Sequence, residues 1–160
     1  MPYLERNLPS GLFHASASLG IAEAAFARAA RPDRINGDAR ALMLVAESAI
    51  DLTASRATIS RAAALIDEHH AANPTADGTD EEITALFAEG QAAKTFVNEA
   101  AMRVVDRALA LSGGAGYLNG SPLARAYRDV RAGAFMHPLG ANRAYDFLAD
   151  VALGRPHELH

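Results

Sequence analysis

Cysteine and tryptophan are absent from this chain of 160 residues, and aromatic residues make up only 6% of it. Without cysteine the chain has no disulfide, thiolate metal site, iron–sulfur cluster or cysteine nucleophile. No run of about 18 apolar residues occurs, so we expect no membrane-spanning helix. The first residues lack a basic segment followed by an apolar one. We therefore expect no signal peptide and a cytoplasmic protein.

Charge is also modest, with a formal net value of -4, which gives no general attraction to nucleic acid or to anionic membranes. What the chain does have is apolar residues, at 50%, and alanine, which fills nearly a quarter of it. Alanine is the best helix former and a poor strand residue, so an all-β fold is excluded. The length suits one domain with a real core.

Two long apolar seams predict the centre of the fold. Over 42–66 and again over 83–111, the core-facing positions alternate in steps of three and four, a heptad-like pattern. An Asn-Pro step and a capping-box spacing that begins at Thr79 separate the two seams. The pattern therefore predicts two antiparallel helices, over 39–72 and 80–112.

Shorter helices are expected on either side of this pair. The first covers 12–30, the fourth runs from Pro122 to Gly133, and the last ends at Gly154. The sequence thus predicts an all-α fold, an up-and-down four-helix-type bundle with a shorter terminal helix pair. These bounds divide the chain into an extended lead-in (1–11), a helical bundle domain (12–154) and a tail (155–160).

A glycine cluster follows the second long helix and comprises Gly113, Gly114 and Gly116. A helix precedes it and no lysine follows, so it is neither a dinucleotide-binding fingerprint nor a Walker loop. Two interpretations stay open. The cluster is a helix C-cap with a tight turn, or its bare backbone N–H groups lie against a phosphate.

Three further side chains need an explanation. Arg56 and Lys94 fall on the apolar seams. Most long basic side chains at such positions extend their charged end into water, whereas a buried cation needs a carboxylate or a bound anion as its partner. His137 precedes Pro138 at a helix junction, where it is either an acid/base candidate or a surface residue. The other histidines lack the carboxylates of a metal site, so we expect no metal.

Several motifs occur together at a family's spacing. Gly113-Gly114-Ala115-Gly116-Tyr117 follows a long helix, and Pro122, Arg125, Arg128 and Asp129 come after it, while Leu19-Gly20-Ile21-Ala22 matches an earlier helix. Over about residues 12–154, the chain resembles the C-terminal domain of the acyl-CoA dehydrogenase superfamily.

The resemblance implies a flavin, FAD or reduced FMN, bound only in a complete or reconstituted enzyme. Such a flavin lies between this bundle, a middle β-domain and an N-terminal helical domain, which this chain does not contain. By that resemblance Gly113, Gly114 and Gly116 are cofactor-binding candidates, toward a flavin held by a neighbouring subunit. It also implies a homo-oligomer, dimer or tetramer. A separately encoded partner that supplies the other domains is one possibility, and the modest charge leads us to expect no nucleic acid or membrane partner.

The segment around His137 indicates which branch of the superfamily is meant. Where dehydrogenases often carry a glutamate base, this chain has Phe135-Met136-His137-Pro138-Leu139, which is more similar to the flavin-dependent monooxygenases. In that branch a histidine lies near the reactive part of the flavin, so the resemblance makes His137 the catalytic candidate. We expect the C-terminal domain of a monooxygenase-like flavin-dependent oxidoreductase, inactive alone. A genuine acyl-CoA dehydrogenase domain and a stand-alone, non-catalytic oligomerisation or binding module are the alternatives.

Overall fold

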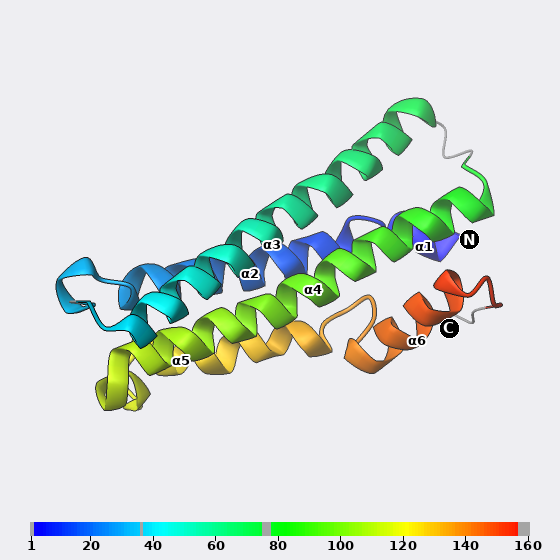
Figure 1. The fold of residues 1–160 in the computed structure, drawn as a ribbon. Coiled ribbons are helices and arrows are strands. Elements are labelled where there is room, and N and C mark those ends of the chain that lie inside the picture. The colour runs from blue at the N-terminus through cyan, green and yellow to red at the C-terminus, as the bar shows by residue number, and fades with distance from the viewer. Residues whose placement is uncertain (1, 36, 75–77, 157–160) are drawn as a thin grey trace.

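The computed structural model describes residues 2–35, 37–74 and 78–156, which form a bundle of helices (Figure 1). The elements are α1 (Pro2–Arg6), α2 (Ser10–Ala29), the 3-10 helix η1 (Pro32–Arg34), α3 (Ala39–Ala72), α4 (Asp80–Ser112), the 3-10 helix η2 (Gly113–Tyr117), α5 (Pro122–Asp129), the 3-10 helix η3 (Val130–Phe135) and α6 (Ala141–Ala152). No strand occurs within these residues, so the all-α prediction is confirmed. None of the helices described is long and apolar enough to cross a bilayer.

The two longest helices, α3 and α4, have the predicted bounds because local signals set their ends. At the start of α4, the Glu82 backbone N–H donates to the Thr79 hydroxyl at 3.3 Å, and the Thr79 N–H donates to the Glu82 carboxylate at 2.9 Å. At the start of α3, the Asp38 side chain accepts from the Arg40 N–H at 2.9 Å. These bonds satisfy N–H groups that a helix start leaves free.

Helix α4 is the axis of the bundle, because it packs against α2, α3, α5, α6 and α1. Figure 1 shows α3 on one side of α4 and α5 and α6 on the other. The predicted fourth helix is α-helical only to Asp129 and continues as η3. A Cβ on Gly133 in η3 would overlap the side chains of Asn98 and Ser18, so this segment lies directly against α4 and α2.

The core follows the two predicted seams over most of their length and departs from them at the start of the first seam. Leu52, Val97 and Val104 are buried as predicted, whereas Ile59 is half-buried. Leu42, at the start of the first seam, is 52% exposed. Helix α3 packs extensively only on α2 and α4, and the start of its apolar stripe faces solvent, whereas Ile66 at the end of the stripe is buried.

The extended lead-in expected at 1–11 is wrong, because Pro2–Arg6 forms α1 and α2 begins at Ser10. Proline is tolerated in the first turn of a helix, where its missing N–H has no partner to lose. Leu4 and Leu8 are 3% and 0% exposed, so this segment is part of the core. Most of the predicted tail, 157–160, lies outside the described residues.

Candidate functional site

The turn that carries His137 lies between η3 and α6 and is held by one side chain of α4. It spans Met136–Leu139 and contains a cis peptide bond between His137 and Pro138. The Lys94 ammonium donates hydrogen bonds to the backbone carbonyl oxygens of Met136, of His137 at 3.3 Å and of Leu139 at 2.7 Å. Three carbonyl groups of one short turn therefore converge on one cation.

Lys94 is 2% exposed, which is rare for a lysine. Burial lowers the pKa of its ammonium from 10.5 to about 8, so the group remains mostly protonated at neutral pH. The sequence suggested a carboxylate or a bound anion as the partner of a buried cation here, and backbone carbonyls take that place instead. Arg56, the other cation on a seam, does reach water, with a side chain 54% exposed that pairs with Glu23 at 2.6 Å.

Asn98 lies one helical turn after Lys94 and holds the segment just before the turn. Its side-chain amide donates to the carbonyl oxygen of Gly133 at 2.9 Å, and the side chain is 4% exposed. Residues four apart share one face of a helix. One face of α4 thus fixes both η3 and the His137 turn against the bundle.

The His137 side chain is exposed and contacts Tyr3 of α1. Its Nε2 lies 3.2 Å from the Tyr3 hydroxyl of α1, and the two rings meet edge to face with centroids 6.2 Å apart. The pKa of His14, on α2, is lowered by burial, and the positive charges of Lys94 and His137 lower it further. An imidazole and a phenol in contact can take up or deliver a proton near neutral pH.

The sequence singled out His137 and, separately, Lys94, but gave no indication of Tyr3 or His14. Tyr3 lies 134 residues away in a segment expected to be extended, and nothing local to it indicates a contact with His137. His14 is one of six histidines, without a motif around it. A signal did exist for Lys94, which is the only lysine among the 15 basic residues and falls on an apolar seam.

The glycine cluster forms η2 at the far end of α4, and each glycine has a different surrounding. Gly113 has a φ of +64°, a conformation that favours glycine, and a Cβ on Gly116 would overlap the Ser112 side chain. Gly114 is exposed, and nothing within the described residues would meet a Cβ there. The fold therefore explains Gly113 and Gly116 and leaves Gly114 unexplained.

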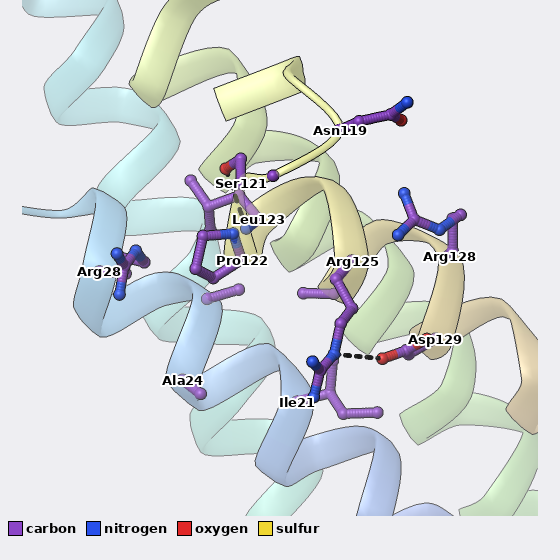
Figure 2. Close-up of a pocket in the computed structure, with 13 residues that line it drawn as sticks. Ile21, Ala24, Arg28, Asn119, Ser121, Pro122, Leu123, Arg125, Arg128 and Asp129 are labelled. Atoms are coloured by element: carbon purple, nitrogen blue, oxygen red, sulfur yellow. Dashed lines mark hydrogen bonds and ion pairs between the residues drawn. The ribbon is translucent and has the colours of Figure 1, made fainter. Parts of the chain in front are cut away.

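Beside this loop, a groove of about 510 Å³ lies between α2 and the start of α5 (Figure 2). Figure 2 shows Arg28 on the α2 side of the groove and Arg125 and Arg128 on the α5 side. Arg125 pairs with Asp129 at 3.6 Å, and both side chains are more than half exposed. Such a pair contributes about 0–1 kcal/mol.

The two predicted regions do not come together in this chain. Lys94 marks the position of the His137 turn along α4, and Gly113 follows the last residue of that helix. At about 1.5 Å of rise per residue, the nineteen steps between them span about 28 Å. The glycine cluster and His137 therefore belong to different surfaces, and the groups around His137 are Tyr3, His14 and Lys94.

Comparison with known proteins identifies the family. Residues 12–142 match the family described as "Acyl-CoA dehydrogenase, C-terminal domain". The amino sugar nitrososynthase DnmZ of Streptomyces peucetius is 41% identical over 137 residues, which are 86% of this chain and 34% of DnmZ. The chain thus spans about a third of the length of the curated relatives it matches.

Solved structures give the same result. KijD3, in complex with FMN and dTDP-3-amino-2,3,6-trideoxy-4-keto-3-methyl-D-glucose, has a TM-score of 0.85 and 36% identity, covering 99% of this chain and 39% of KijD3. A nitrososynthase from Micromonospora carbonacea var. africana has a TM-score of 0.82 and 38% identity, covering 94% of this chain and 39% of that protein. With its helical bundle, its glycine cluster and this match, the chain belongs to the acyl-CoA dehydrogenase C-terminal domain family.

Proposed function

We propose that this chain is the C-terminal part of a flavin-dependent monooxygenase that oxidises the nitrogen of an amine, with an amino sugar as the substrate class. The observation that carries the proposal is the turn at 136–139. It presents an imidazole, His137, against the phenol of Tyr3, at the place where the dehydrogenase branch would carry a glutamate. The relatives named as amino sugar nitrososynthases support the substrate class.

The residues present fit a flavin on two separate surfaces. At the His137 turn the exposed imidazole and the Tyr3 hydroxyl form one polar wall of a site, and the buried Lys94 ammonium lies behind the turn. At the glycine cluster, Gly114 leaves bare, exposed backbone that a cofactor of a neighbouring subunit can approach closely. Each surface supplies only one side, so the proposal requires the remaining domains, in the same polypeptide or as a separately encoded partner.

In this reaction, reduced flavin supplies two electrons, dioxygen gives one oxygen atom to the amine nitrogen, and the other oxygen atom leaves as water. The contribution of this chain is proton handling. The His137 imidazole takes a proton from the substrate amine or delivers one to the departing oxygen, and the Tyr3 hydroxyl orients its Nε2. A glutamate at this place would instead remove a proton from the carbon next to a thioester.

The proposal includes assembly and location. Apolar side chains exposed along α3, such as Met43 at 55% and Ile50 at 67%, support a homo-oligomer, a dimer or a tetramer. We place the complete enzyme in the cytoplasm, as the sequence led us to expect, and cell fractionation tests that placement.

A chimera tests the function directly. The C-terminal domain of DnmZ, 41% identical, is replaced by this chain, and amine-dependent oxygen consumption is measured with reduced flavin and an amino sugar nucleotide. We expect activity in the chimera and a fall of about a hundredfold or more in turnover for His137→Ala, as for a lost acid/base group. His70→Ala, an exposed histidine on α3, is the matched control and should retain turnover. The chain alone should be inactive.

Two results would contradict this function. If His137→Ala folds and turns over like the parent chimera, the imidazole has no part in the chemistry. If the chimera reduces its flavin readily with an acyl-CoA and this rate is insensitive to His137→Ala, the dehydrogenase function replaces the monooxygenase one.

A further inference from the structure

Lys94 differs from the other basic residues both in its residue type and in its burial. It is the only lysine in a chain with 15 basic residues, and the other fourteen are arginines. It is 2% exposed on the central helix, whereas the side chains of Arg56, Arg61 and Arg103 are at least 44% exposed and that of Arg107 is 17% exposed. The one buried cation of the described core is thus the one that is not an arginine.

The shape of an ammonium group accounts for this choice. An ammonium carries three N–H donors around a single nitrogen, and here three carbonyl oxygens, of Met136, His137 and Leu139, surround it. A guanidinium is a flat fork whose donors spread over three nitrogens, which suits a carboxylate better than three oxygens that converge on one point. The site therefore specifies lysine in particular, and a positive charge alone does not satisfy it.

All three acceptors lie in the same short turn, which bears the proposed acid/base group. The carbonyl oxygens at 136, 137 and 139 flank the His137 side chain on both sides along the backbone. His137 itself contributes its imidazole to the Tyr3 contact and its carbonyl to Lys94. Moving the turn away from the ammonium would therefore displace the imidazole from Tyr3.

We propose that Lys94 is a positioning residue, whose ammonium organises the Met136–Leu139 turn and thereby sets the His137 imidazole against Tyr3. Its effect on the structure of the turn stands on the geometry alone. Its effect on turnover rests on the proposed function of His137.

The first test uses the unmodified 160-residue chain. Because the chain has a single lysine, isotope labelling of lysine gives one side-chain ammonium signal, with no assignment problem. We expect its N–H protons to exchange with water about tenfold or more slowly than those of an exposed lysine, since burial and three acceptors protect them. An ammonium signal that exchanges like an exposed lysine would overturn the proposal.

The second test compares Lys94→Met and Lys94→Arg by hydrogen exchange and mass spectrometry. In both variants the backbone amides of 133–141 should exchange about tenfold faster or more, while α3 stays protected as in the parent chain. Arg61→Met, which removes an exposed cation from α3, is the control and should leave 133–141 unchanged. Unchanged exchange in both Lys94 variants would overturn the proposal, and parent-like exchange in Lys94→Arg alone would reduce it to a charge effect. If neither variant folds, the ammonium signal of the parent chain decides.

The third test uses the DnmZ chimera and a double-variant comparison. If Lys94 acts through His137, Lys94→Met should lower kcat, and Lys94→Met combined with His137→Ala should be no slower than His137→Ala alone. An additive loss would overturn the positioning role. If His137→Ala retains full turnover, the proposed function fails, while the two measurements on the isolated chain still decide whether Lys94 holds the turn.

Discussion

At the residue scale, His14 reports on the charges around the His137 turn. Burial lowers the pKa of His14 from 6.5, and the positive charges of Lys94 and His137 lower it further. We expect Lys94→Met to raise the pKa of His14, because one of the two charges is removed. NMR titration of the imidazole signals, assigned with His14→Asn, measures the change. Arg128→Met removes a charge from the exposed surface of α5 and should leave the pKa of His14 as it is; an equal rise there would show that net charge alone is responsible.

Single residues also show what a sequence can reveal about a site. A local motif surrounds His137, and another contains Gly113, Gly114 and Gly116, so the sequence alone was enough to propose these residues for a site. The contacts of His137 were not predictable, since the Tyr3 hydroxyl reaches it only through the packing of α1 on α4. The carbonyl partners of Lys94 leave no trace in a sequence at all, because every residue has a carbonyl group.

At the scale of elements, an ion-pair group joins α3 to α4. Asp51, whose side chain is 14% exposed, accepts hydrogen bonds from Arg103 at 2.8 Å and Arg107 at 2.6 Å. Burial raises the pKa of Asp51, but these two guanidinium groups outweigh that effect and hold the pKa below its usual value of 3.8. The folded chain thus binds a proton on Asp51 less readily than the unfolded chain. The resulting stabilisation is present above the unfolded pKa and is lost as the pH falls through the folded one.

Because the pKa of Asp51 is lower in the folded chain, its ionised form stabilises the fold at pH 7. We therefore expect Asp51→Asn to lower the free energy of unfolding by about 1–3 kcal/mol at pH 7, as for a lost charged hydrogen-bond group. The difference between variant and parent should shrink in acid, where the parent carboxylate is itself protonated. Urea unfolding at neutral and acid pH measures both. Glu89→Gln, in the exposed pair with Arg61, should change stability by less than about 1 kcal/mol. A loss that is equally large in acid would assign the effect to packing.

The α3–α4 contact also depends on apolar packing. Leu52 of α3 is 4% exposed in the cluster that includes Val104 and Val105 of α4. We expect Leu52→Ala to cost about 2–5 kcal/mol, because the truncation leaves a cavity that the helices fill only in part. Leu153→Ala, at a side chain 61% exposed, should stay within about 0.5 kcal/mol. Equal losses in chemical denaturation would mean that Leu52 is not in the core.

The sequence predicted best those helices whose ends carry local capping or helix-stop residues. Helices α3 and α4 begin at Asp38 and Thr79 caps and end at an Asn-Pro step and a glycine, so their bounds follow from neighbouring residues. Helix α1 has no such pattern, with only five residues and a proline at its start. Its stability comes from burying Leu4 and Leu8 against the bundle, which only the tertiary structure shows.

At the scale of the whole molecule, the first turns of α3 leave a group of apolar side chains uncovered. Helix α3 packs with one side on α2 and α4, and its other side carries Leu42, Met43 and Ile50, which are 52%, 55% and 67% exposed. Exposed apolar side chains that recur along one helix favour contact with another protein surface. This α3 face is thus a candidate contact with a second copy, in line with the proposed homo-oligomer.

Light scattering on the isolated chain tests this assembly. We expect a mass of two or four times 16.8 kDa at micromolar concentration, because the α3 face buries apolar surface between copies. Ile50→Glu places a charge in that contact, and burying an unpaired charge is costly, so this variant should shift toward 16.8 kDa with its helical content unchanged. Leu153→Glu puts the same charge at an exposed apolar position near the end of α6 and should keep the parent mass. A parent chain of 16.8 kDa would contradict self-assembly of this domain. A parent oligomer that persists in Ile50→Glu would instead move the contact to another face.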